Sequence, residues 1–220
     1  MKTLVVAPHP DDEVLGCGGL LLRRKDEGAC LGWLILTRNS EEMNWDAQKI
    51  ERRNIEILQV KEALGVQQLF KLDYPSAQLD SIPMHDLVEK CGRVFDEFAP
   101  DEVLMPHWGD VHSDHRIAFD ALTACTKWFR YPSIMRVLAY ETLSETNVGL
   151  RPGDRFCPNY FADIDLYLEQ KIDLAATYQS EMGQFPFPRS REAIKALAHL
   201  RGAQSGFNAA EGYELLLERV

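Results

Sequence analysis

The N-terminal segment constrains the fold more than any other part of the sequence. A short apolar run, Thr3–Ala7, predicts a buried strand, and Pro8-His9-Pro10 ends it because proline has no N–H to donate to a sheet. Three acidic residues follow at 11–13, and then a glycine-rich segment, Gly16–Gly19, leads into an apolar stretch typical of a helix. Polar side chains therefore occupy a strand-to-helix turn, which is where open α/β sheets bind ligands.

Apolar runs alternate with helical patterns through roughly the first 130 residues, which predicts βαβ units and a parallel sheet. In this region the predicted strands after the first are Leu31–Thr37, Leu69–Leu72 and Glu102–Met105, and the predicted helices are Gly18–Asp26, Ala47–Leu64 and His85–Phe98. Further along we predict strands at Met135–Glu141 and Asn159–Ala162 and helices at Asp165–Gln179 and Glu192–Arg201. Glu211–Val220 is ambiguous between helix and strand. We expect one α/β domain over residues 1–220, with a Rossmann-like, mostly parallel sheet and a C-terminal helical extension.

Composition limits the classes of function. The 220 residues fit one domain, and 45% hydrophobic with 26% charged residues is typical of a globular chain. A formal net charge of −10 argues against a nucleic-acid-binding protein, which normally carries a basic face. The five cysteines form no CxxC pair, no leader-like segment precedes the first strand, and no apolar run approaches the ~20 residues of a membrane span. We therefore expect a cytoplasmic protein with reduced thiols and no membrane span.

A second cluster of ligand-type residues follows the strand Glu102–Met105. It runs from His107 to His115, and four of the six histidines in the chain lie in this turn or in the first one. Because parallel strands have their carboxyl ends at the same edge of a sheet, the two turns can converge. The second turn would then give the first a further metal ligand, and spacing alone leaves both His112 and His115 open for that role.

The residue types in the two turns suit a divalent metal. An imidazole and a carboxylate, His9 and Asp12, are typical ligands of zinc or of another first-row ion. A catalytic zinc site needs three protein ligands and one open position, so the third ligand has to come from elsewhere in the chain. Neighbouring residues on an irregular turn point in different directions. Asp11 can therefore face a water molecule while Asp12 binds the metal.

These motifs resemble those of the LmbE-like, or PIG-L, zinc-dependent de-N-acetylases. The segment Ala7–Gly19 is similar to the opening motif of that family, and His112-Ser113-Asp114-His115 is similar to its His-x-Asp-His motif. Similarity to bacterial members extends to Arg53-x-x-Glu56, to Tyr140-Glu141 and to the tail from Pro188 to Tyr213. The glycines of the first motif lack the GxGxxG spacing of a dinucleotide site, so close helix–strand packing is the better explanation for them.

The resemblance also implies roles for individual residues. It implies three zinc ligands, namely His9, Asp12 and His115. It further implies that Asp11 is the general base and that His112 faces the substrate carbonyl or the leaving amine. A protonated His112 could stabilise the developing oxyanion. Asp114 would act as a supporting group that orients His112 or His115.

Three further residues are candidate substrate contacts. In the family, the position of Arg53 is associated with substrate contact, and a solvated arginine on a helix surface is the alternative. Trp108 and Asp110 follow the fourth strand and could line a sugar pocket or pack within the loop. The sequence departs from many relatives at Thr37-Arg38-Asn39, where they have Thr-x-Gly, so Arg38 is expected to alter the charge of the pocket.

The resemblance implies zinc-dependent hydrolysis of the N-acetyl group of an N-acetylglucosamine-type amino-sugar conjugate, with release of acetate and a free amine. One alternative is an amidase for another small amide, such as a thiol–sugar conjugate. Another is a non-catalytic metal-binding homologue, but the presence of both Asp11 and His112 favours catalysis. The substrate is expected to be a small molecule. The resemblance also implies that the protein forms a homo-oligomer, such as a hexamer. The Phe185–Tyr213 tail has few obvious sheet partners and is our candidate for part of the interface.

Overall fold

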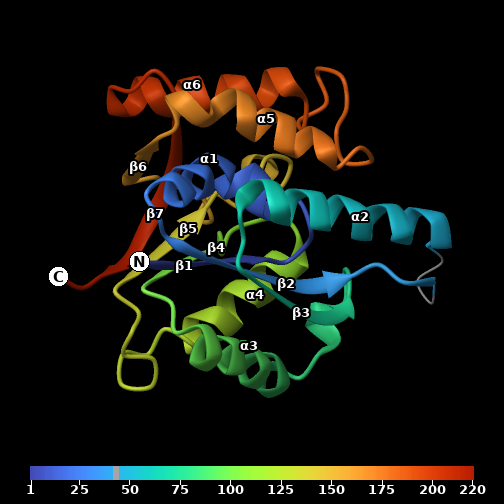
Figure 1. Cartoon of the computed structure of the whole chain (residues 1–220), viewed down its shortest axis with the longest axis vertical. Coiled ribbons are helices and arrows are strands. Elements are labelled where there is room, and N and C mark those ends of the chain that lie inside the picture. The colour runs from blue at the N-terminus through green and yellow to red at the C-terminus, as the bar shows by residue number, and fades with distance from the viewer. Residues whose placement is uncertain (42–44) are drawn as a thin grey trace.

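The computed structural model describes residues 1–41 and 45–220, and within them seven strands form one sheet in the order β3-β2-β1-β4-β5-β7-β6 (Figure 1). The strands are β1 (Lys2–Ala7), β2 (Cys30–Arg38), β3 (Gln68–Pro75), β4 (Glu102–Pro106), β5 (Arg136–Tyr140), β6 (Tyr160–Asp163) and β7 (Ala210–Glu218). The helices are α1 (Asp12–Asp26), α2 (Ala47–Leu64), α3 (Met84–Phe98), α4 (Ser113–Ala124), α5 (Leu168–Thr177) and α6 (Arg191–Ser205). Short 3₁₀ turns lie at Leu79–Ser81, Thr146–Val148 and Asp165–Tyr167.

The sheet is mostly parallel, which confirms the predicted fold class. Strands β3, β2, β1, β4 and β5 pair in parallel, and only β7 runs antiparallel to its neighbours β5 and β6. Strands β2 and β3 lie on one side of β1, and the chain then crosses over to form β4 on the other side. The strand order therefore reverses between β1 and β4. The crevice at the carboxyl ends of these two strands is the expected ligand site of such a sheet.

Helices cover both faces of the sheet (Figure 1). One apolar cluster joins the sheet to α1, α2, α5 and α6, and a second joins it to α3 and α4. Alternate residues of β1 face opposite clusters, since Val5 and Ala7 belong to the first and Leu4 and Val6 to the second. Burial on both faces explains why the parallel strands read as continuous apolar runs in the sequence.

Helix α1 begins at Asp12, whereas the apolar pattern predicted a start near Gly18. The glycines lie inside the helix because neighbouring side chains approach its backbone too closely for a Cβ atom. A Cβ on Gly16 would lie 2.3 Å from Cδ2 of Tyr140, and one on Gly19 would lie 2.5 Å from Cγ2 of Ile164. The glycine spacing therefore reflects close packing, as the sequence indicated.

A buried ion pair is inserted against the middle of α1. The carboxylate of Glu211 in β7 accepts hydrogen bonds from the backbone N–H groups of Gly19 and Leu20, each at 2.8 Å. Lys171 in α5 donates to the carbonyl oxygen of Leu15 at 2.9 Å and lies 2.6 Å from Glu211. This pair ties α5 and β7 to α1, the helix that begins at the candidate site.

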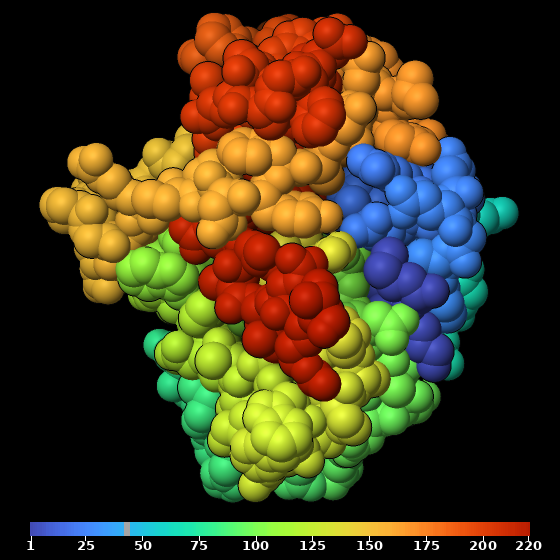
Figure 2. Space-filling view, turned by 90° about the vertical axis from the view of Figure 1, so that its left-hand side faces the viewer, coloured from blue at the N-terminus to red at the C-terminus, as the bar shows by residue number. Residues whose placement is uncertain are grey.

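The C-terminal segment is a strand, which resolves the ambiguity of Glu211–Val220. Strand β7 inserts between β5 and β6, and Tyr213 pairs with both Tyr140 and Tyr160. The expectation that the Phe185–Tyr213 tail has few sheet partners was therefore wrong at its end, because antiparallel pairing of β7 depends on strands distant in sequence. In Figure 2 the red C-terminal segment lies at the surface at this end of the sheet.

Two features expected from the sequence concern membrane-spanning helices and the state of the cysteines. No helix in the described part of the chain is both long and apolar enough to cross a membrane. All five cysteines are free thiols, and Cys17, Cys91 and Cys125 are buried, as expected for reduced cysteines that pack as small apolar residues.

Candidate active site

The two polar turns meet at the carboxyl ends of β1 and β4. These strands are parallel neighbours, and Val5 pairs with Leu104, so the turn after each strand leaves the sheet at the same edge. The imidazole rings of the two turns lie together. Ring centroids are 4.5 Å apart for His9 and His112, and 5.4 Å apart for His9 and His115. The predicted convergence of the two turns is present in the structure.

Three side chains from these turns form a group that could hold a metal ion. Oδ2 of Asp12 lies 3.5 Å from Nδ1 of His9 and 3.2 Å from Nε2 of His115. One ligand atom from each residue can be chosen so that all lie within 4.8 Å of one another. Asp12 and His115 are buried, and His9 is partly exposed toward the pocket. Two imidazoles and one carboxylate match the three protein ligands of a catalytic zinc site.

The hydrogen bonding of His115 suits a metal ligand. Its Nε2 atom is buried and has no hydrogen-bond partner in the described structure, while its Nδ1 atom is paired with a carboxylate. A buried polar atom without a partner is costly, and a metal ion would satisfy it. Burial would raise the pKa of Asp12, but His115 and His9 hold it well below its usual range, so Asp12 is a carboxylate. This donor set fits a divalent cation.

A second possible group shares His9 but is less suited to a metal. It consists of His9, His112 and Asp114. The carboxylate of Asp114 already accepts hydrogen bonds from the backbone N–H groups of Ala77 at 2.7 Å and Leu79 at 3.0 Å, and its Oδ2 lies 2.9 Å from Nε2 of His9. Most of its acceptor capacity is used, so the geometry favours the group containing Asp12 and His115.

Two buried carboxylates hold the imidazoles of the preferred group. Asp114 contacts Nε2 of His9, whereas the sequence suggested that it would orient His112 or His115. Oδ2 of Asp110 lies 2.8 Å from Nδ1 of His115, and its Oδ1 accepts a hydrogen bond from Thr146 at 2.6 Å. Each carboxylate fixes the ring orientation of one imidazole, as partners of metal-binding histidines commonly do.

Asp11 is held in a strained position beside this group. Its φ angle of 136° lies in a region that residues other than glycine rarely adopt, at a cost of about 1–3 kcal/mol. Its backbone N–H donates to Glu13 at 3.0 Å, and its Oδ2 accepts a hydrogen bond from Arg189 at 2.9 Å. Burial and the neighbouring Asp12 raise the pKa of Asp11 to about 7 against the opposing effect of Arg189. The side chains of Asp11 and Asp12 point to different partners, Arg189 for Asp11 and the two imidazoles for Asp12.

His112 precedes the first turn of α4 and faces the pocket. Its Nδ1 atom accepts a hydrogen bond from the N–H of Asp114 at 3.1 Å, so a neutral ring carries its proton on Nε2. Burial and the nearby His9 and His115 lower the pKa of His112 to about 4. The sequence suggested a protonated His112. The structure instead favours a neutral imidazole that can donate one hydrogen bond.

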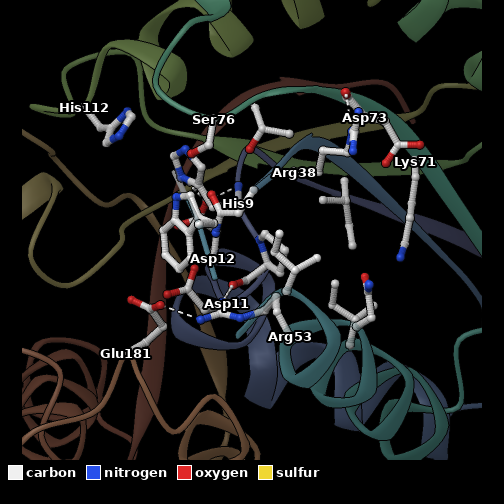
Figure 3. Close-up of a pocket in the computed structure, with 18 of the residues that line it drawn as sticks. His9, Asp11, Asp12, Arg38, Arg53, Lys71, Asp73, Ser76, His112 and Glu181 are labelled. Carbon is white, nitrogen blue, oxygen red and sulfur yellow. Dashed lines mark hydrogen bonds and ion pairs between the residues drawn. The ribbon is translucent and has the colours of Figure 1, made fainter. Parts of the chain in front are cut away.

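His9, Asp11, Asp12 and His112 line a cavity of about 520 Å³. Figure 3 shows part of its lining. That volume is within the usual range of small-molecule sites. His9, Asp11 and Asp12 gather at one end with Glu181 and Arg53 beside them, and Arg38, Lys71 and Asp73 lie toward the other end (Figure 3). The walls come from the ends of β1, β2 and β3, from α2, from the turn before α4 and from the chain between α5 and α6.

Comparison with known proteins identifies the family. The model of the PIG-L family, described as GlcNAc-PI de-N-acetylase, matches residues 4–126, more than half of the chain. The chain belongs to the PIG-L family. It is 27% identical to the diacetylchitobiose deacetylase of Thermococcus kodakarensis over 96% of this chain and 81% of that protein.

Solved structures share the fold of this PIG-L protein. A conserved protein of Thermus thermophilus is 29% identical, with a TM-score of 0.79 over 99% of this chain and 96% of that one. The N,N'-diacetylchitobiose deacetylase of Pyrococcus horikoshii has a TM-score of 0.80 over 98% of this chain and 84% of that one, and its 20% identity shows a shared fold. This PIG-L protein is a hydrolytic N-deacetylase, and its family is metal-dependent.

The three predicted substrate contacts take different places in this PIG-L protein. Arg53 lines the cavity, but its guanidinium nitrogens are engaged by Pro10, Glu56, Ser180 and Glu181. Asp110 is buried behind His115 and does not line the cavity. Trp108 does not line it either, and its ring lies tilted against His107 at 5.2 Å. A substrate contact remains a prediction for Arg53. Packing against His107 explains the position of Trp108, and hydrogen bonds to His115 and Thr146 explain that of Asp110.

The structure also brings residues to the PIG-L site that sequence reasoning did not assign to it. Arg189 and Glu181 reach the cavity from the chain between α5 and α6, and Thr142 and Glu145 reach it from the turn after β5. Arg189 lies in the Pro188–Tyr213 tail that is similar to bacterial members, but no local pattern assigned any of these residues to the site, because each lies far in sequence from the two motifs. Arg38 is the exception, since the departure at Thr37-Arg38-Asn39 suggested its effect on pocket charge, and it does line the cavity.

Proposed function

We propose that this protein is a zinc-dependent deacetylase that removes the N-acetyl group of an N-acetylglucosamine-type amino-sugar conjugate. The observation that carries the proposal is the position of Asp11 beside the group His9, Asp12 and His115, with Asp11, His9 and Asp12 lining one cavity. The name of the Thermococcus relative, a diacetylchitobiose deacetylase, supports a substrate of this class. The products would be acetate and a free amine.

His9, Asp12 and His115 would hold the zinc ion, with Asp114 and Asp110 fixing the two imidazoles. When bound, the ion would lower the pKa of a water molecule and polarise the acetyl carbonyl. The residues around it then decide where protons go. Asp11 is the acceptor for the proton of the attacking water, because its carboxylate faces the cavity beside Asp12.

His112 would supply a hydrogen bond to the acyl oxygen. Its Nδ1 is occupied by the N–H of Asp114, which leaves Nε2–H as the donor, and the residue lines the cavity. A fixed donor aimed at the developing oxyanion stabilises the transition state more than the substrate. The departing amine also needs a proton. Asp11, having accepted a proton from the attacking water, can deliver it to the amine, whereas neutral His112 contributes a hydrogen bond and keeps its proton.

The lining of the cavity favours a sugar over an apolar amide. Polar side chains outnumber apolar ones along the β2, β3 and α2 walls, and they include Thr37, Asn39, Asn54, Asp73 and Ser76. Trp45 adds an aromatic surface on which a sugar ring could stack. Such a surface offers hydrogen bonds to several hydroxyl groups at once. A small thiol–sugar amide would still fit, so the amide itself has to be determined by assay.

The first experiment compares the wild-type protein and His9→Ala, both purified without added metal. We expect near-stoichiometric zinc in the wild type, little in the variant, and acetate release by the wild type from N-acetylglucosamine conjugates, including N,N'-diacetylchitobiose. Zinc without acetate release from any N-acetylated sugar, and without cleavage of other small amides, would support a non-catalytic metal-binding protein. The absence of zinc even after zinc is offered would contradict the metal site.

We also propose a homo-oligomer in a reducing compartment such as the cytoplasm. Phe185 and Phe187 are 67% and 40% exposed, and two exposed aromatic rings this close in sequence suit a subunit contact. The five free cysteines suit a reducing compartment. Light scattering tests the assembly directly, and a monomer mass would contradict it.

A further inference from the structure

Arg189 reaches the site from the chain between α5 and α6. Its Nη1 atom lies 2.9 Å from Oδ2 of Asp11 and 3.2 Å from Oε2 of Glu181. The side chain lines the cavity and is 22% exposed. We propose that Arg189 is a positioning residue that holds the carboxylate of Asp11 in the orientation required of a general base. This inference rests on the proposed function, because it takes Asp11 to be that base.

The backbone around Arg189 is fixed, so the guanidinium is presented from a defined place. The N–H of Gly183 donates to the carbonyl oxygen of Arg189 at 3.3 Å, which closes the loop between them. The N–H of Ser190 donates to Phe187 at 3.1 Å, and the Ser190 hydroxyl caps α6. The guanidinium carbon lies 5.9 Å from the centroid of the Phe187 ring. Gly183 permits the tight loop, since a Cβ there would lie 2.6 Å from Cδ1 of Phe187.

Arg189 engages only one oxygen of the Asp11 carboxylate. In the described structure, the hydrogen bond of this carboxylate to protein is the one that Oδ2 accepts from Arg189. The backbone of Asp11 is held separately, through the bond from its N–H to Glu13. With the backbone and one oxygen fixed, the direction of Oδ1 is also fixed. Oδ1 is then the oxygen available to a water molecule.

Glu181 holds Arg189 from the other side. It contacts Arg189 and also Arg53, and Arg53 in turn donates to the carbonyl oxygen of Pro10 at 2.7 Å. Pro10 directly precedes Asp11. Arg53 therefore holds the backbone of the turn that carries the base, and Arg189 holds its side chain. Glu181 contacts both arginines, and Figure 3 shows Glu181 and Arg53 beside Asp11. Two guanidinium groups and their carboxylates thus brace one turn.

A competing explanation is that Arg189 binds substrate. Its Nε atom is buried and has no hydrogen-bond partner in the described structure, so one donor is free. A substrate contact and a positioning role differ in their kinetic effects. Loss of a contact made equally in the ground state and the transition state raises KM with kcat unchanged, whereas misplacement of the base lowers kcat.

The test uses full-length, zinc-loaded Arg189→Ala and Arg189→Lys, with the N-acetylated sugar that the wild type deacetylates best. We expect Arg189→Ala to lose about 10²-fold in kcat with little change in KM and with its zinc retained. Lysine keeps one charged donor and should recover part of the loss. Millimolar guanidinium chloride should raise the kcat of Arg189→Ala, whereas sodium chloride at equal ionic strength should not.

Arg191→Ala is the matched control. Arg191 lies two residues further along, pairs with Asp173 at 2.7 Å, and both side chains are at least half exposed. We expect wild-type kinetics for this variant and no response to guanidinium. Unchanged kcat in Arg189→Ala, or a rise in KM alone, would overturn the positioning role.

A second measurement separates this inference from the proposed function. If the wild type releases acetate from no substrate, the proposed function fails, but the pairing can still be tested through the free energy of unfolding. Asp11→Asn, Arg189→Ala and the double variant form a thermodynamic cycle. Non-additive effects would support the contact through which Arg189 acts. Additive effects would show that Arg189 does not hold Asp11, and the inference would be wrong.

Discussion

Oδ2 of Asp110 lies 2.8 Å from Nδ1 of His115, and both side chains are fully buried. The contact turns Nε2 of His115 toward Oδ2 of Asp12, 3.2 Å away. A residue that the sequence suggested as a substrate contact therefore orients a predicted metal ligand. This pair therefore makes His115 the imidazole of the second motif that faces Asp12 as the third proposed ligand.

Removing the orienting carboxylate should weaken metal binding. We expect Asp110→Ala to lower zinc affinity about 10–100-fold, because His115 would lose the partner that fixes its ring. Competition with a chelator of known affinity measures the change. Asp120→Ala, an exposed acidic position on α4, is the control and should bind zinc as the wild type does. Equal affinities in the two variants would contradict the role of Asp110.

Replacing the proposed base should separate metal binding from turnover. Asp11→Asn keeps the size of the side chain but cannot accept the proton of the attacking water. We expect zinc content to be unchanged and acetate release to fall about 10²–10⁴-fold. Zinc analysis on the assayed sample serves as the internal control. Turnover at the wild-type rate would remove Asp11 as the base.

The two histidines of the second motif should differ in their effects. His115→Ala should lose the metal, because Nε2 of His115 faces Asp12. His112→Ala should keep the metal and lose activity, because His112 faces the cavity and is held through Nδ1 by the N–H of Asp114. Metal content of both variants, measured side by side, checks the assignment. The reverse pattern would mean that the overlapping group of His9, His112 and Asp114 binds the ion.

Loss of the buried ion pair between Lys171 and Glu211 should lower the stability of the protein more than loss of an exposed ion pair. Lys171→Met leaves the carboxylate of Glu211 buried without its partner, and such a loss costs about 3–5 kcal/mol in the free energy of unfolding. The exposed pair of Lys195 and Glu169, at 2.8 Å, offers a matched control. Lys195→Met should cost no more than about 1 kcal/mol. Chemical denaturation measures both, and similar values would show that the buried pair contributes little.

A methyl group added to α1 should test its packing. In Gly16→Ala the new Cβ would meet Tyr140 at 2.3 Å, and Tyr140 is held by the hydrogen bond from its hydroxyl to Val6 at 2.9 Å. Overpacking of this kind costs about 1–3 kcal/mol in the free energy of unfolding. The higher helix propensity of alanine offsets at most about 1 kcal/mol of that cost. We expect lower stability on thermal unfolding. Gly153→Ala, with no atom within 4 Å of its Cβ, should change little.

Local signals in the sequence were sufficient wherever a structure depends on neighbouring residues. The helix Ala47–Leu64 has its predicted bounds, with Asp46 accepting a hydrogen bond from Gln48 and Gly65 at a φ angle of 69°. The cap and the glycine act within one turn of the helix, so their effect can be predicted locally. The start of α1 could not be predicted in this way, because its glycines respond to Tyr140 and Ile164, which are distant in sequence and pack against the helix.

The sequence by itself determined the parallel sheet and the placement of His9, Asp12 and the second motif on two turns at one edge. Tertiary structure decided which groups those side chains meet. The contact between Arg189 and Asp11 spans 178 positions, and that between His9 and Asp114 spans 105. Pairings at such separations depend on how strands and helices pack in three dimensions. Residue type and spacing therefore predict the kind of site, and the folded chain alone sets its hydrogen bonds.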